Sequence, residues 1–267
     1  MDVSLSWLRV FLAFTFCLSL FACGNRYDLS TARGQNSRID DANMFLSKGE
    51  CTEADAAISP LYASSYVNDQ VRIIKASAQA CFAGFSLLTF ASKIIGATNF
   101  FDSMALSLAN VQNDAARQWM YNAVDVLTLS GSALAASQRA TAVNSYMVFL
   151  QLGVISAIIR NYGSPISSAG AKGTALVYSA VSTPSGQMSN VDACALTAAF
   201  SFLTDSFANA DLTDADSASL VSAMNKVCTS AGLSSCSVLN RDRTQCDGTN
   251  QNSIYAQEVV TSVNSSW

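Results

Sequence analysis

Cysteine is the residue type in this chain with the most potential for chemistry. The 267 residues include 8 cysteines and no histidine. Catalytic thiols and hydroxyls commonly use a histidine as the neighbouring base, and zinc sites commonly use histidine or C-x-x-C pairs. No C-x-x-C occurs in the sequence. The pattern therefore favours structural disulfides over a thioredoxin-like redox site or a zinc site.

Other patterns that could support catalysis or ligand binding are absent or incomplete. No G-x-S-x-G occurs, and the segment 170–174 (GAKGT) lacks the spacing of a phosphate-binding loop. The net charge of -4 argues against binding nucleic acid through its phosphates. We therefore expect a protein that is not an enzyme, binds no metal and carries no cofactor. Carboxylate or serine chemistry without a signature motif stays open.

The N-terminal residues have the organisation of an export signal. Arg9 precedes an uncharged apolar run over residues 10–22. A membrane span needs about 20 apolar residues, so this shorter run has the length of a signal-peptide h-region. The run leads into LFAC at residues 20–23, which resembles the lipobox of bacterial lipoproteins. This resemblance implies that Cys23 is diacylated on sulfur and becomes the mature N-terminus. An ordinary signal peptide or an uncleaved anchor is the alternative.

A lipid anchor at this position implies a location at the bacterial cell envelope. Each buried CH₂ contributes ~0.8 kcal/mol, and stable attachment takes more than one acyl chain. Gly24 rather than Asp follows the cysteine. By resemblance to the enterobacterial sorting rule, this favours the outer membrane, with the periplasmic or surface side left open. Residues 23–37 are polar and rich in turn formers, so we expect an extended or mobile tether.

Residues 38–267 are predicted to form one α-helical domain. Apolar residues recur at helical spacing, alanine is frequent and strand-like alternation is scarce. Residues 82–108 and 140–159 are apolar around most of the helix surface, which is typical of buried helices. Residues 161–173 break the pattern and are predicted to form a long loop inside this domain. A polar C-terminal cap over residues 234–252 and a short last helix complete the prediction.

Residues 45–54 (FLSKGECTEA) resemble the helical turn of a tetratricopeptide (TPR) repeat. In that family a helix ends in Gly, an acidic residue follows, and Glu-Ala opens the second helix. Gly49 fits a left-handed helix end. Gly84 follows thirty-five residues later, close to the ~34-residue period of these repeats. The resemblance implies an array of antiparallel helical hairpins, which binds partners on a concave face. A single helical hairpin with a Gly turn is the alternative.

The remaining cysteines are an even set in a chain predicted to reach an oxidising compartment. Cys17 leaves with the signal peptide and Cys23 takes the lipid. Three disulfides are therefore expected among Cys51, Cys81, Cys194, Cys228, Cys236 and Cys246. A TPR-like stack implies that the first two of these pair with each other.

The pairing of the four C-terminal cysteines has two readings. Cys194 and Cys228 lie on the apolar stripes of consecutive predicted helices, which favours a bond between them. Cys236 and Cys246 would then staple the polar C-terminal segment. The alternative joins Cys228 to Cys236, which is close in sequence, and leaves Cys194 for Cys246.

These observations favour a membrane-anchored helical scaffold that binds a protein partner. The alternative is a ligand-binding lipoprotein with an apolar pocket, loosely similar to the TPR lipoproteins that accompany TRAP transporters. One structural feature separates the two readings. A large enclosed apolar cavity favours a small ligand, whereas a filled core with an exposed groove favours a protein partner.

Overall fold

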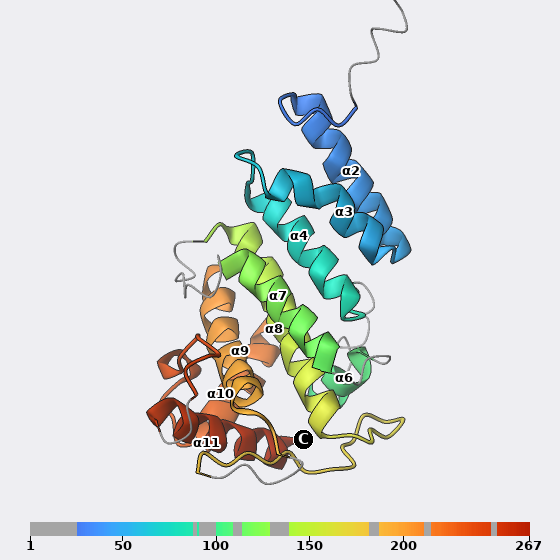
Figure 1. Cartoon of the computed structure of the whole chain (residues 1–267). Coiled ribbons are helices and arrows are strands. Elements are labelled where there is room, and N and C mark those ends of the chain that lie inside the picture. The colour runs from blue at the N-terminus through green and yellow to red at the C-terminus, as the bar shows by residue number, and fades with distance from the viewer. Residues whose placement is uncertain are drawn as a thin grey trace, which may run out of the picture. The chain divides into compact units, whose positions relative to one another are not determined.

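The chain is all-α and disulfide-stabilised, as the sequence predicts (Figure 1). The computed structural model describes residues 26–87, 90, 100–108, 114–128, 139–181, 187–210, 215–246 and 250–267. Within these ranges there is no β-strand, and Ile166 and Lys172 form an isolated β-bridge. The chain divides into two compact units, Met1–Val67 and Asn68–Trp267.

The first unit is a helical hairpin. It consists of α2 (Ala32–Lys48) and α3 (Cys51–Tyr62), which run antiparallel and pack against each other (Figure 1). Gly49 joins them with a φ of 74°. A Cβ on Gly49 would meet nothing within 4 Å, so the left-handed backbone alone explains the glycine. The predicted turn between two antiparallel helices is confirmed.

The helical hairpin begins before the predicted end of the tether. Helix α2 starts at Ala32, where Thr31 accepts a hydrogen bond from the Gly34 backbone N–H at 3.0 Å. Residues 26–31 are also folded, because Tyr27 donates to Asp41 at 2.7 Å. The prediction of an extended tether through residue 37 is therefore wrong over residues 26–37. The polar residues of this segment cap α2 and form hydrogen bonds with it. Composition alone does not distinguish such a segment from a solvated linker.

The second unit is a helical assembly around α8 (Thr141–Tyr162). Helix α8 packs against α4 (Asp69–Phe82), α6 (Phe100–Ser107), α7 (Asp114–Thr128) and α9 (Asn190–Asn209). Helix α9 in turn contacts α10 (Ala215–Ser230), the 3-10 helix η2 (Cys236–Val238) and α11 (Gln251–Ser266). Figure 1 shows α7, α8 and α9 side by side along the middle of this unit.

Helices α8 and α9 are apolar around nearly their whole circumference. They are long and apolar enough to cross a membrane, but most of each helix is buried inside the protein. Core helices of globular proteins have the same composition. In this structure the apolar surface of both helices is covered by other helices, so the predicted buried helix over residues 140–159 is confirmed.

A hydrogen bond from Ser77 to Tyr146 connects α4 with α8. The Ser77 hydroxyl donates to the Tyr146 hydroxyl at 2.6 Å. Burial raises the pKa of Tyr146 to about 12, although the bond from Ser77 opposes this shift. The neutral phenol therefore stabilises the fold up to about pH 10, its ordinary pKa, and this contribution is lost as the pH rises toward 12.

This shift predicts a late-ionising tyrosine. In a rapid alkaline pH-jump followed by phenolate absorbance, we expect Tyr146→Phe to remove signal that appears near pH 12. The signal that appears near pH 10 should stay unchanged. Loss of signal near pH 10 instead would show that the Tyr146 hydroxyl is in contact with water.

The long loop between α8 and α9 is fixed by the last residues of the chain. Helix α8 ends at Tyr162, so the loop predicted over residues 161–173 is confirmed from residue 163 onward. The Trp267 indole donates to Asp102 at 3.1 Å and to the Gly170 carbonyl at 3.0 Å. A Cβ on Gly163 would lie 2.3 Å from the Trp267 ring. Glycine at position 163 therefore makes room for this indole.

The C-terminal disulfides follow the second of the two predicted pairings. Cys194 is bonded to Cys246, and Cys228 is bonded to Cys236. The expected Cys194–Cys228 bond is wrong because the chain reverses directly after α10, at Gly232 with a φ of 76°. This turn brings η2 back to the end of α10, and the following residues then cross α9.

Cys51 and Cys81 are disulfide-bonded as well. The bond between these two residues stays a prediction of the TPR resemblance. Gly84 follows the end of α4 with a φ of 74°, the same value as Gly49. Both glycines thus end helices in the left-handed conformation, as expected for equivalent positions of a repeated hairpin.

Candidate binding groove

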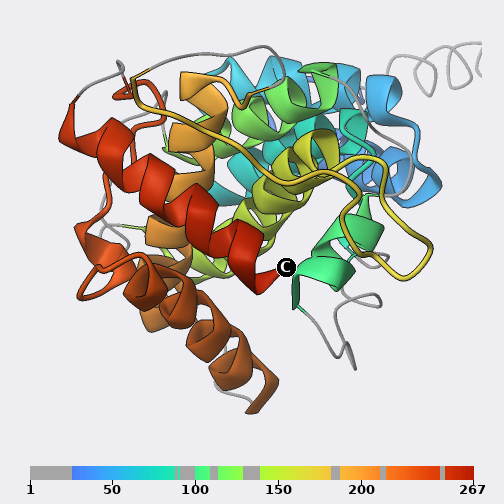
Figure 2. The same ribbon diagram turned by 90° about the horizontal axis from the view of Figure 1, so that it is seen from below.

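An open groove lies between α10 and α11. Its volume is about 650 Å³, within the range of ligand sites in proteins. Figure 2 shows α10 and α11 running next to each other. They are fixed to each other at the base of the groove, where the Ser262 hydroxyl donates to the Val227 carbonyl at 2.8 Å. The groove is therefore built into the packing of these helices.

The groove has a charged side chain on each wall. Lys226 of α10 and Glu258 of α11 both line it, and both are exposed. Neither side chain makes a hydrogen bond or an ion pair within the described part of the chain. Opposite charges on facing walls can bind the two ends of a ligand that carries both signs.

Hydroxyl and amide groups make up most of the remaining lining. Gln257 lies on the α11 wall, and its side-chain oxygen accepts from the Ala180 backbone N–H at 3.0 Å, which leaves its NH₂ group as a donor. The groove also contains the hydroxyls of Ser230, Thr261, Ser265 and Ser266. The Thr261 hydroxyl donates to the Gln257 carbonyl at 2.8 Å and the Ser265 hydroxyl to the Thr261 carbonyl at 2.9 Å. Their oxygens remain acceptors, so this surface can accept from the N–H groups of a peptide backbone, while the Gln257 NH₂ group can donate to its carbonyls.

A small pocket lies between the described parts of α7, α8 and α9. The pocket lined by Tyr121, Val154 and Phe202 has a volume of about 20 Å³, enough for about one water molecule. Phe200 of α9 and Leu150 of α8 are among the large side chains that are fully buried. This pocket is far too small for a lipidic or drug-sized ligand.

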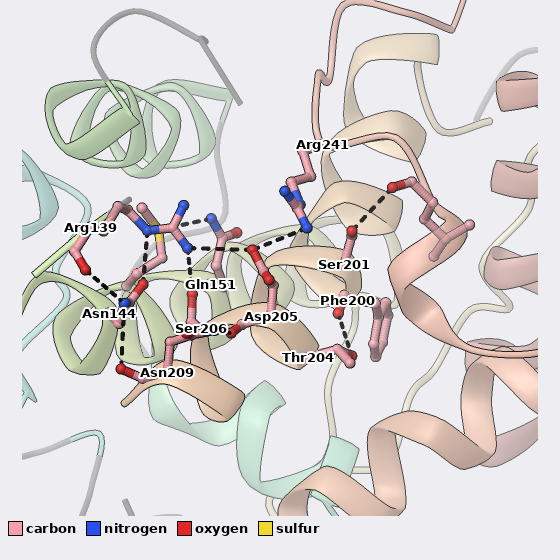
Figure 3. Close-up of polar contacts among 12 residues, drawn as sticks. Arg139, Asn144, Gln151, Phe200, Ser201, Thr204, Asp205, Ser206, Asn209 and Arg241 are labelled. Atoms are coloured by element: carbon pink, nitrogen blue, oxygen red, sulfur yellow. Dashed lines mark hydrogen bonds and ion pairs between the residues drawn. The ribbon is translucent and has the colours of Figure 1, made fainter. Parts of the chain in front are cut away.

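Two arginines and one aspartate hold the residues after η2 against α9. Figure 3 shows Arg139 and Arg241 on opposite sides of Asp205. The Asp205 carboxylate lies 3.0 Å from Arg241 and 3.8 Å from Arg139. Arg139 also donates to Asn144 at 2.9 Å and to Ser206 at 3.0 Å. These contacts fill the donor sites of a buried guanidinium, so we assign this cluster to structure.

Asp192 is a buried acidic residue near the start of α9. It is 4% exposed and lies in the first turn of α9. Its carboxylate accepts from Tyr121 and Tyr162, each at 2.5 Å, from Ser189 at 2.8 Å and from Arg117 at 3.2 Å. These donors join α7, the end of α8 and the start of α9 at one carboxylate.

The environment of Asp192 makes it a permanent acceptor. Burial alone would raise the pKa of this carboxyl group, but hydrogen bonds from Tyr121 and Tyr162 and the charge of Arg117 lower it below its ordinary value. Burial and the nearby carboxylate raise the pKa of Tyr121 well above 10. Because four donors occupy the carboxylate, it has no free position for a substrate proton. We therefore assign Asp192 a structural role.

The structure brings the four C-terminal cysteines together in pairs, and none of these four lines the groove. Cys228 and Cys236 fix the turn that follows α10, below the groove. The predicted lipidation residue, Cys23, lies outside the described ranges. No group of three metal-ligating side chains occurs among the residues that the structure describes.

Sequence reasoning missed the groove. The α11 residues that line the groove have the spacing of one helix face, but polar residues on an exposed helix face are ordinary. It also did not identify the cap of α9, where the Ser189 hydroxyl accepts from the Asp192 backbone N–H at 3.1 Å. The signal was present, because Ser-x-x-Asp resembles a capping box.

Comparison with known proteins identifies no relative: no family model, no curated protein and no solved structure matches the chain.

Proposed function

We propose that this protein is a membrane-anchored helical scaffold of the bacterial envelope that binds a protein partner. The anchor is the lipid on Cys23 that the lipobox-like sequence predicts. The partner-binding surface is the groove between α10 and α11. The outer membrane is the favoured location, because Gly24 follows the cysteine.

The observation that carries this proposal is the contrast between the groove and the core. The groove is open, polar and about 650 Å³ in volume, whereas the apolar pocket holds about 20 Å³. A scaffold needs an accessible surface on a rigid support, and disulfides provide rigidity next to this groove. The alternative of a ligand-binding lipoprotein with an apolar pocket has no comparable support from the described residues.

Lipidation at Cys23 is tested by metabolic labelling with a palmitate analogue. We expect the wild-type protein to take the label and to fractionate with membranes. Cys23→Ser should take no label, because the acyl chain is attached through this sulfur. Label on Cys23→Ser, or none on the wild type, would contradict the anchor.

Partner binding is tested by crosslinking at the groove. A photo-reactive amino acid replaces Ser230 in the full-length protein, and crosslinked products are isolated from envelope membranes and analysed by mass spectrometry. The matched control carries the same group at Ser47, an exposed residue of α2. A protein crosslinked from position 230 and not from position 47 supports the proposal, whereas identical products from both positions contradict it.

A further inference from the structure

The chemistry of the groove restricts the kind of segment that it can bind. The described residues that line it include no aromatic side chain, so among them a sugar ring has no surface to stack on. Among the described residues of its lining, Ala231 is the one with an apolar side chain, so they form no deep apolar pocket for the large anchor side chains of an amphipathic helix. The groove instead offers hydroxyls, an amide and two charges.

Helix geometry places these groups along the length of the groove. Lys226 and Ser230 are four residues apart in α10 and share one face of that helix. Glu258, Ser262 and Ser265 share one face of α11 for the same reason. The groove is therefore a polar channel with one cationic and one anionic wall.

The two charges are available to a ligand because they are not used inside the protein. Lys226 and Glu258 are exposed and form no ion pair with each other. A ligand with a single charge would pair with one wall and leave the other unmatched. A ligand with both charges matches both walls, and its orientation across the groove is then fixed.

We infer that the groove between α10 and α11 binds an extended polar peptide segment that carries one acidic and one basic side chain. The acidic side chain pairs with Lys226 and the basic side chain pairs with Glu258. The backbone N–H groups of the segment donate to the hydroxyl oxygens of Thr261 and Ser265, and a backbone carbonyl accepts from the Gln257 NH₂ group. This inference rests on the proposed partner binding and names the chemistry that the partner must present.

The test uses the full-length mature protein with serine at position 23 and a panel of capped Gly/Ser peptides. Each peptide carries one Glu and one Lys at increasing separation, and control peptides carry only Glu or only Lys. Binding is followed by NMR shifts of the Ser230 and Thr261 amides. We expect the doubly charged peptides to bind at least fivefold more tightly than either control peptide, and less tightly at high salt.

Charge reversal provides the decisive variants. We expect Lys226→Glu and Glu258→Lys each to weaken binding of the best peptide about tenfold, because each brings like charges together. The double variant Lys226→Glu/Glu258→Lys should restore binding, since the same peptide can bind in the reversed orientation. Lys48→Glu and Glu53→Lys on exposed positions of α2 and α3 are matched controls and should have no effect.

Two results would overturn the inference. The first is equal binding of singly and doubly charged peptides, or binding of none. The second is a double variant that binds no better than the single variants. Neither result affects the crosslinking experiment. If a partner is crosslinked at position 230 and one of these results is also obtained, the proposed scaffold function is retained and the proposed peptide chemistry is rejected.

Discussion

Replacing Cys194 and Cys246 together with alanine is expected to lower the free energy of unfolding by about 4 kcal/mol. This disulfide joins residues 52 positions apart. In the chain-entropy model, a loop of this length restricts the unfolded chain by about that amount. Urea denaturation of the wild-type and doubly substituted proteins measures the difference, and substituting both residues avoids a free thiol.

The second C-terminal disulfide provides the internal comparison. Cys228 and Cys236 are only 8 positions apart, so the same model predicts a loss of about 2.5 kcal/mol for the corresponding double variant. A loss at Cys228/Cys236 equal to or larger than that at Cys194/Cys246 would refute the loop-length argument. Peptide mapping without reduction should recover these two pairs and no link between Cys194 and Cys228.

Asp192→Asn is expected to destabilise the second unit by about 3–5 kcal/mol. The substitution keeps the shape of the side chain but removes the charge that balances Arg117, which is 7% exposed. A buried charge that loses its partner has a cost of about this size. It also leaves Tyr121 and Tyr162 with a weaker common acceptor. Thermal or urea unfolding monitored by circular dichroism provides the measurement.

Asp114 supplies the matched control, because it pairs with the same arginine. The Asp114 carboxylate lies 2.8 Å from Arg117, but its side chain is 93% exposed. We expect Asp114→Asn to change stability by less than about 1 kcal/mol, since solvent screens exposed ion pairs. Equal losses for Asp114→Asn and Asp192→Asn would show that burial does not set the strength of these contacts.

The effect of Asp192→Asn should also depend on pH. The pKa of Asp192 is lowered by its hydrogen bonds to Tyr121 and Tyr162 and by Arg117. A lowered carboxyl pKa contributes stability above the ordinary value of about 4, and this contribution is lost as the pH falls through the folded-state pKa. The wild type and the variant should therefore converge in stability below pH 4. A difference that stays constant down to strongly acidic pH would contradict an ionised Asp192.

Local sequence signals predicted most of the helices, because caps and apolar spacing act over one or two turns. Asn68 accepts from the Val71 backbone N–H at 3.0 Å and begins α4, and Gly49 ends α2. The buried character of α8 was evident from the lack of a polar face. Residues 26–31 were misjudged because the same polar residue types occur in caps and in linkers.

The disulfide pairing and the groove depend on where whole helices lie. Local patterns do not decide whether Cys228 pairs with Cys194 or with Cys236, because the choice depends on the direction of the chain after Gly232. Tyr162 and Arg117, which bond to Asp192, lie 30 and 75 positions from it in the sequence. No helical periodicity relates residues that far apart.

Local sequence patterns are sufficient to predict an all-α protein, disulfides among six of its cysteines and the positions of its principal helices. These properties follow from capping, from apolar spacing and from the number of cysteines, all of which are local or compositional. The pairing of the C-terminal cysteines, the burial of Asp192 and the position of the groove are known from the three-dimensional structure alone. Each of these depends on contacts between segments far apart in the chain, and such contacts are set by the packing of helices as units.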